Sequence, residues 1–235
     1  MSTIASNAPQ TLAGLEEVDR ILDSAIFLAL DGWCTPEKAK RMARLVAQAG
    51  ADRYILAVEL GVFGGRGTIA MGLAVKHCLA GIGAVHGIDP FTKQAALEGT
   101  NAIQNAEWWG KLDYEAVKIK AARAIRDFGV DKYTRLVIEK SLDVVGTYPD
   151  GCVDVLHQDS NHSEEVSCAE VEAWAPKVSR RGFWVFDDID WPTTKKAQGM
   201  LVERKFNLIE MHKTWAVFQR SEHLARATSA SKSLS

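Results

Sequence analysis

Segments with helical spacing of apolar residues alternate with short, mostly apolar segments along most of this chain. Apolar residues recur at helical spacing over 39–49, behind a Thr35-Pro36 start, and Gly50 ends that segment. The run 54–60 that follows is short and apolar, which is typical of a strand buried on both faces. Alternation of this kind predicts an α/β fold, with a mostly parallel sheet covered by helices on both faces.

The pattern continues to the far end of the chain and then changes. Further strands are predicted at 85–89, 135–139, 153–157, 182–187, 206–211 and 214–219, and further helices at 68–79, 117–128 and 163–177. Only His212-Lys213 separates the last two strands, which is too short for a crossover helix and predicts an antiparallel pair. The prediction is therefore a Rossmann-like, seven-stranded, mostly parallel sheet with an antiparallel last strand.

Three divisions of the chain follow from these patterns. Residues 1–50 are expected to form an N-terminal helical cap, and 51–220 the main α/β domain. Within it, 92–113 lacks clear periodicity and is longer than an ordinary connection, so we interpret it as an inserted loop near the ligand edge. The Ser-, Ala- and Thr-rich residues 221–235 are predicted to be a disordered tail.

Composition narrows the class of protein. With 47% hydrophobic residues, the chain can build a sizeable core, and its 28 Lys and Arg nearly balance 30 Asp and Glu, which suggests neither a nucleic-acid nor a membrane partner. Four separated cysteines without a C-x-x-C pair indicate free thiols rather than a zinc site. No signal peptide or membrane span is visible, so we expect a cytoplasmic protein, and homo-oligomerisation stays open.

A glycine-rich turn follows the first predicted strand. It reads Glu59-Leu60-Gly61-Val62-Phe63-Gly64-Gly65-Arg66-Gly67-Thr68 and runs into a helix. Glycine accepts positive φ and lets a ligand approach the main chain, while the helix N-terminus offers free N–H groups. The alternative is a tight strand-to-helix turn that binds nothing.

Asp89, at the end of the next strand, is placed to accept hydrogen bonds from ribose hydroxyls. The glycine spacing is not the G-x-G-x-x-G of nicotinamide-binding domains, and Glu59 would repel a pyrophosphate. A ligand with a cationic amino-acid end tolerates that carboxylate better.

The turn resembles the first motif of class I S-adenosylmethionine-dependent methyltransferases, most closely the macrocin O-methyltransferase and cephalosporin-hydroxylase-like group. Gly67 before Thr68 departs from that group's pattern. The resemblance implies S-adenosylmethionine as the cofactor. It assigns the following residues to the cofactor site: Glu59 and Gly61 at the methionine end, Gly65 and Thr68 in the same turn, Asp89 at the ribose, Ser141 at the adenine side, and Asp159.

Carboxylates end the fourth and fifth core strands. The segment 153–165 resembles the group's D-x-x-H-x-D-G-x-H-x-x-E block, with Ser160 in place of glycine. Since neighbouring parallel strands end at one sheet edge, we expect Asp159, Asp187 and Asp188 to converge. Three carboxylates repel unless protons or a cation neutralise them, which predicts a metal site for Mg²⁺ or another divalent cation. Catechol O-methyltransferase is similar in this respect. The alternative is that these are solvated or capping carboxylates.

His162, three residues after Asp159, is the candidate general base, and its alternative role is to cap the helix beginning at Ser163. We interpret His157, inside a buried strand, as a hydrogen-bonded core residue. Trp109 and Trp191 lie in segments beside the expected ligand edge and are candidates for the wall of a substrate pocket.

The sequence thus predicts an S-adenosylmethionine-dependent, divalent-metal-assisted O-methyltransferase, with residues 51–220 as its methyltransferase domain. The small-molecule acceptor would be a hydroxylated compound such as a sugar or a phenolic natural product. Two alternatives stay open. One is a metal-independent N- or S-methyltransferase, and the other is a cofactor-binding, hydroxylase-like protein without methyl transfer.

Overall fold

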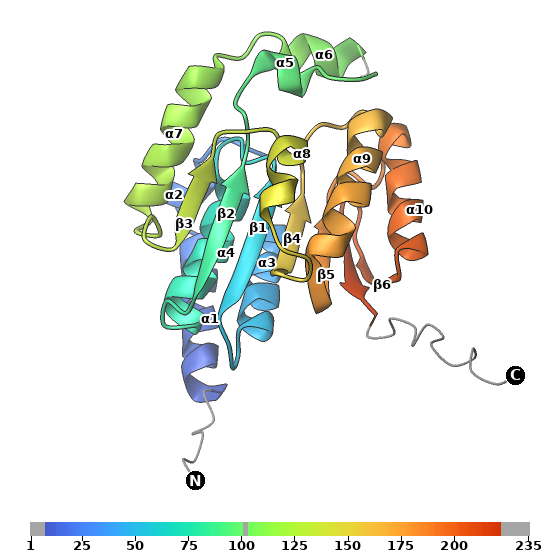
Figure 1. The fold of residues 1–235 in the computed structure, drawn as a ribbon. Helices are drawn as coiled ribbons and strands as arrows, with labels where there is room; N and C mark the ends of the chain where they lie inside the picture. The colour runs from blue at the N-terminus through green and yellow to red at the C-terminus, as the bar shows by residue number, and fades with distance from the viewer. Residues whose placement is uncertain (1–7, 101–102, 222–235) are drawn as a thin grey trace, which may run out of the picture.

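A single seven-stranded sheet forms the centre of the molecule (Figure 1). This structure, a computed structural model, describes residues 8–100 and 103–221. The strands are β1 (Ile55–Leu60), β2 (Gly83–Ile88), β3 (Thr134–Val137), β4 (Val153–Gln158), β5 (Val178–Phe186), β6 (Phe206–Met211) and β7 (Ala216–Arg220). Their order across the sheet is β3-β2-β1-β4-β5-β7-β6, and β7 pairs antiparallel with both β5 and β6. The predicted fold class is confirmed, including the antiparallel last strand.

Helices cover both faces of the sheet, as the alternating pattern requires. They are α1 (Ala8–Leu22), α2 (Ala25–Leu28), α3 (Pro36–Ala49), α4 (Arg66–Cys78), α5 (Lys93–Ala96), α6 (Ile103–Trp109), α7 (Tyr114–Asp127), α8 (Ser141–Val144), α9 (Glu164–Trp174) and α10 (Lys195–Glu203), with 3₁₀ turns at Val145–Thr147, Ala175–Lys177 and Pro192–Thr194. Helices α1, α3 and α4 lie against one face, and α9 and α10 against the other (Figure 1).

Side-chain alternation along the strands divides the core in two. In β1, Ala57 packs with α1, α3 and α4, whereas Val58 packs with α9 and α10. The neighbouring strand β4 repeats this, with Val155 on the first side and Leu156 on the second. Successive strand residues point to opposite faces, so odd-numbered residues of β1 and β4 face α3 and α4.

Helix α3 places a charged residue on its buried stripe. Thr35 caps the helix by accepting a hydrogen bond from the Lys38 N–H at 3.3 Å, and Pro36 begins it. The buried positions are Lys38, Ala39, Met42, Ala43, Leu45, Val46 and Ala47. Lysine is almost never fully buried unless it is paired, so Lys38 requires a partner inside the protein.

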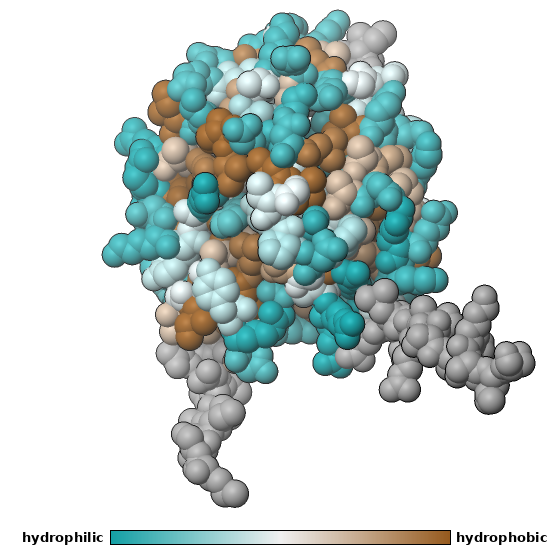
Figure 2. All heavy atoms as spheres, viewed as in Figure 1, coloured by the Kyte–Doolittle hydropathy of each residue, from teal (hydrophilic) through white to brown (hydrophobic). Residues whose placement is uncertain are grey.

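The inserted segment is more regular than its sequence suggests. The range 92–113, predicted as a loop, contains α5 and α6 among its described residues, and these helices lie above the edge where the parallel strands end (Figure 1). Figure 2 shows apolar side chains gathered just below that segment on the viewed face.

The predicted N-terminal cap, 1–50, contains α1, α2 and α3, and α1 and α3 share one core with the sheet. Of the predicted tail 221–235, residues 222–235 lie outside the described residues. Within the described ranges, no helix is long and apolar enough to cross a membrane.

Candidate active site

The glycine turn after β1 is tight for reasons internal to the protein. Gly61 has φ +84°, and a Cβ built on it would lie 2.1 Å from the main-chain oxygen of Asp159. Its N–H donates to the carbonyl of Ile88 at 2.9 Å. Gly65, at φ +89°, is the N-cap of α4. We expected glycine at 61 because a ligand approaches the main chain, whereas the structure shows that the close approach of β4 also requires it.

Glu59 is buried at the floor of this turn, with 2% of its surface exposed. It is the register partner of His157, whose Nδ1 lies 2.9 Å from Glu59 Oε1. The Thr68 hydroxyl donates to the other carboxylate oxygen, Oε2. Gly67 leaves the room for this arrangement, since a Cβ there would lie 1.8 Å from Glu59 Oε1. Thr68 is fully buried and positions Glu59, and His157 is hydrogen-bonded in the core as we interpreted it.

Asp89 holds the turn from the end of β2. Its Oδ2 accepts hydrogen bonds from the N–H groups of Val62 and Phe63 at 2.9 and 3.0 Å, and its Oδ1 accepts one from Phe91 at 2.7 Å. Burial raises the pKa of Asp89, against these three hydrogen bonds. Asp89, the residue predicted to bind the ribose hydroxyls, is thus hydrogen-bonded through its side chain to the glycine turn.

Ser141 begins α8 at the neighbouring strand end, where the resemblance places the adenine side of the cofactor. Its hydroxyl donates to the buried carboxylate of Glu170 in α9. Burial raises the pKa of Glu170 although Ser141, Ser160 and Gln158 all hydrogen-bond to it. These contacts fix the rim of the strand edge beside Asp89.

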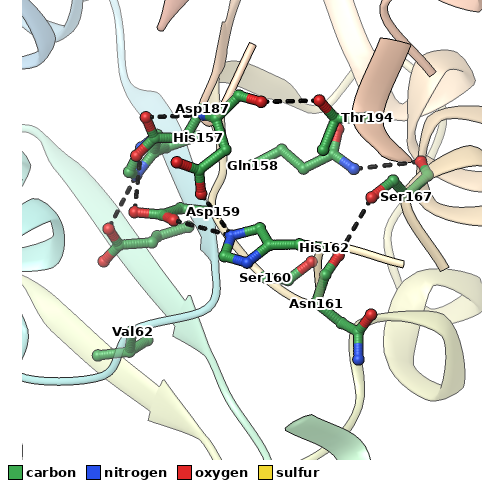
Figure 3. A network of polar contacts seen from close by, with 12 residues as sticks. Val62, His157, Gln158, Asp159, Ser160, Asn161, His162, Ser167, Asp187 and Thr194 are labelled. Atoms are coloured by element: carbon green, nitrogen blue, oxygen red, sulfur yellow. Dashed lines mark hydrogen bonds and ion pairs between the residues drawn. The ribbon is translucent and has the colours of Figure 1, made fainter. Parts of the chain in front are cut away.

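The three predicted carboxylates converge at the ends of β4 and β5. The Asp159 N–H donates to the carbonyl of Leu60 at 2.9 Å, and the Asp187 N–H donates to that of Gln158 at 3.0 Å, so both residues continue the sheet pairing. Figure 3 shows the side chains of Asp159, Asp187, His157 and His162 directed toward one another. We name Asp159, Asp187 and Asp188 the acidic cluster.

Lys38, which was not among the predicted site residues, reaches into the acidic cluster from α3. Its Nζ forms an ion pair with Asp187 Oδ2 and lies 3.6 Å from Asp159 Oδ2, while only 3% of its side chain is exposed. Burial disfavours the ammonium, but the surrounding negative charges, Asp159 foremost, raise the pKa of Lys38. One signal could have found it: Lys38 precedes Met42 by one helical turn, on the apolar stripe of α3.

His162 lies on the more open side of the same cluster. Its Nε2 is 2.5 Å from Asp188 Oδ2 and 3.9 Å from Asp159 Oδ1. Burial opposes the charged imidazole, but Asp159 and Asp188 outweigh it and raise the pKa of His162 to about 9. Ser163 is the residue that caps α9, accepting from the Val166 N–H at 3.3 Å, so His162 is not needed as the cap.

Two groups of side chains in the described ranges could hold a metal ion. The inner group is His157, Asp159 and Asp187, and the outer group is Asp159, His162 and Asp188, with the ligand atoms of each group within 4.8 Å of one another. The predicted set of three aspartates is thus divided between two groups. Each group already contains or contacts a basic side chain, Lys38 at the inner one and His162 at the outer one.

Two adjoining cavities open at this sheet edge. The smaller, about 190 Å³, runs along Asp89, Phe91 and Ser141. The larger, about 560 Å³, runs along Lys38 and Trp191 and includes the acidic cluster. Both are lined by Gly61, Phe63, Asn105, Trp109, Asp159 and His162. The glycine turn and the acidic cluster therefore lie at the boundary between two compartments.

Aromatic side chains form one wall of the larger cavity. Trp33 stacks on Phe63 with ring centroids 5.4 Å apart, and Trp108 and Trp109 pack edge-to-face at 4.8 Å. On another side, the Trp191 ring lies 4.8 Å from that of His162. Trp109 and Trp191 thus line the cavity where they were expected, and Trp33, 62% exposed, is an aromatic residue that the sequence analysis overlooked.

Comparison with known proteins identifies the class. A family model described as a methyltransferase domain matches residues 58–189. No curated protein sequence matches the chain.

Solved structures of similar fold include several methyltransferases. The O-methyltransferase NovP has 18% identity, covers 80% of this chain and 81% of its own, and superposes with a TM-score of 0.65. TomG from Streptomyces achromogenes, an O-methyltransferase involved in tomaymycin synthesis and solved with S-adenosylmethionine, has 16% identity, 90% coverage of both chains and a TM-score of 0.57. An O-methyltransferase from Bacillus cereus has 14% identity, 88% and 91% coverage, and a TM-score of 0.54.

The family match covers more than half of the chain, including the glycine turn, Asp89 and the acidic cluster. The strand order, with its antiparallel seventh strand, is that of the Rossmann-like methyltransferase fold. The chain belongs to the class I S-adenosylmethionine-dependent methyltransferases.

Proposed function

We propose that this enzyme transfers a methyl group to a hydroxyl of a small ring compound, a sugar or a phenolic natural product. The observation that carries this proposal is the larger cavity, which is lined both by His162 with the acidic cluster and by the aromatic residues Trp33, Phe63, Trp108 and Trp109. Flat aromatic side chains bind rings by stacking, and an imidazole can accept a hydroxyl proton. The structural similarity to the O-methyltransferases NovP and TomG also supports methyl transfer to an oxygen atom.

The cofactor fits the residues at the cavity boundary. Gly61 leaves the main chain bare, and the buried Glu59 carboxylate below it suits a cationic amino-acid end. Asp89 and Ser141 would hold the adenosine part along the smaller cavity. When bound, S-adenosylmethionine supplies an electrophilic methyl group. The protein's own task is to place an acceptor oxygen in line with that group, which brings a large entropic advantage.

His162 is the proposed general base. Asp188, 2.5 Å from its Nε2, stabilises the imidazolium that forms when the acceptor hydroxyl loses its proton. Trp191 packs beside the imidazole and restricts its orientation. The same carboxylates keep His162 largely protonated near neutral pH, so the base is most effective in mildly alkaline solution.

The divalent cation predicted from the sequence competes with this arrangement. At the outer group an ion would take His162 as a ligand, and the imidazole could not then accept a proton. At the inner group it would have to displace Lys38 from Asp187. The predicted aspartate set therefore does not fit an ion while Lys38 is in place, and no step of the proposed reaction passes through a metal.

Methyl transfer can be tested directly. The purified protein, with S-adenosylmethionine and separate panels of phenols, catechols and sugars, should yield acceptors heavier by one methyl group in mass spectrometry. His162→Gln should lower turnover by roughly 10²–10⁴-fold while the cofactor dissociation constant stays unchanged. Methylation of amines or thiols only would refute O-transfer. Cofactor binding without turnover of any acceptor would favour the hydroxylase-like alternative.

A further inference from the structure

The inner part of the acidic cluster is built around a single point. Asp159 Oδ2 and Asp187 Oδ2 lie 3.9 and 3.8 Å from His157 Nε2. The same two oxygens face the Lys38 ammonium, which pairs with Asp187 and lies 3.6 Å from Asp159. Any ion that used the inner group as ligands would need the space that the Lys38 ammonium now holds.

We propose that Lys38 is the resident cation of the acidic cluster and takes the place of a divalent ion between Asp159 and Asp187. The role of Lys38 in catalysis rests on the proposed function. In that function Lys38 is a positioning residue. Lys38 balances the two carboxylates and fixes their orientation, and so Asp159 stays available to His162 at the cavity boundary.

The fold delivers Lys38 to this position with little freedom. Its N–H is held by the Thr35 cap at the start of α3, and Met42 and Leu45 on the same stripe are fully buried. Its side chain cannot turn to solvent without crossing that packed face. An unpaired buried ammonium is costly, as is an unpaired buried carboxylate, so Lys38 and Asp187 stabilise each other only as a pair.

The charges around the ammonium agree with its role. Burial opposes the charged form of Asp159, but Lys38, foremost, and the two histidines lower the pKa of that carboxyl. Cys34, which also faces the larger cavity, does not add a charge, because burial raises its pKa to about 12. The positive charge next to Asp159 and Asp187 is therefore supplied by the chain itself.

Metal binding by variants of the whole chain tests the proposal. Lys38→Met removes the ammonium but keeps a long side chain, and Lys40→Met is the matched control, since Lys40 lies on the same helix and pairs with Asp23 at 2.6 Å instead. Mn²⁺ alone is titrated and followed by electron paramagnetic resonance and by thermal unfolding. We expect no stoichiometric Mn²⁺ in the wild type or Lys40→Met. Lys38→Met should bind Mn²⁺ at least about tenfold more tightly, and its Tm should rise with Mn²⁺ because the ion binds only the folded state.

Two results would overturn the proposal. One is a wild-type protein that binds one Mn²⁺ per chain and loses it on Asp187→Asn. The other is a Lys38→Met variant that is as stable as the wild type and gains no affinity for Mn²⁺. If Lys38→Met does not fold, the double variant Lys38→Met/Asp187→Asn decides. The double variant should fold and should not bind Mn²⁺. If it does not fold, the proposed pairing of Lys38 with Asp187 is wrong.

These readouts require no methyl acceptor. If the wild type methylates nothing but the Mn²⁺ results follow expectation, the proposed function fails while the role of Lys38 as resident cation stands. Conversely, methyl transfer that needs Mg²⁺ and is lost with chelator would retain the function and overturn the inference about Lys38.

Discussion

Replacing Thr68 by valine tests whether this residue serves the cofactor or the protein. Threonine and valine have nearly the same shape, so Thr68→Val removes a hydroxyl and little else. Thr68 is fully buried, and its hydroxyl donates to the carboxylate of Glu59, which is itself 2% exposed. The variant would leave that carboxylate with His157 as its remaining side-chain partner among those described.

The size of the effect follows from the charge of the acceptor. A hydrogen bond to a charged group contributes about 1.5–3 kcal/mol, and water cannot replace the lost donor at a fully buried site. For a domain of this size, each kcal/mol shifts Tm by about 2–4 °C, so the ligand-free variant should unfold about 3–12 °C below the wild type. Thr68→Ser keeps the hydroxyl and should recover most of the loss, apart from a small cavity left by the methyl group.

Chemical denaturation and thermal unfolding of the ligand-free protein give the stability, and calorimetry gives the affinity for S-adenosylmethionine. If Thr68→Val were as stable as the wild type within about 0.5 kcal/mol, yet bound the cofactor tenfold more weakly, the reasoning would be wrong. Thr68 would then contact the cofactor, as the resemblance to the family motif implies.

Three further outcomes are expected. Gly61→Ala should destabilise the protein severely, because its Cβ would meet Asp159 at 2.1 Å and φ is +84°, whereas Gly146→Ala meets nothing within 4 Å and should be nearly neutral in urea unfolding. Equal stability of the two would refute the close approach of β1 and β4. The rate of methyl transfer should rise with pH toward about 9 as His162 loses its proton, and a flat profile from pH 6 to 9 would exclude it as the base. Because the folded pKa of His162 is raised, its charge stabilises the protein fully below pH 6.5, and urea unfolding should show that contribution disappearing as pH rises through about 9, but not in His162→Gln.

The sequence was sufficient for those parts of the site that lie on strands. Successive side chains of a strand point to opposite faces of the sheet, and parallel strands end at one edge, so the convergence of Asp159, Asp187 and Asp188 could be predicted. The antiparallel end of the sheet followed from the length of the link at His212-Lys213 alone.

The contribution of the helices could not be read in the same way. Lys38 and Asp187 are 149 positions apart in the sequence, and no local pattern specifies which helix packs over which strand end. The short helices of the inserted segment were missed because α5 and α6 are too brief for a clear period. Their position above the strand edge depends on contacts such as that of the Asn161 amide, which donates to the carbonyls of Ala95 and Ala96.

The ion pair between Lys38 and Asp187 also bears on how the chain folds. It joins helix α3 to the residue that follows β5, 149 positions later in the sequence, so it forms only after strands β1 to β5 have been synthesised. A fragment that begins at residue 51 would retain all seven strands, but the buried Asp187 carboxylate would lack the Lys38 ammonium as its partner. We therefore expect that the N-terminal helices and the sheet are one cooperative folding unit, and that an excised α/β domain would aggregate or stay partly unfolded instead of forming a smaller enzyme.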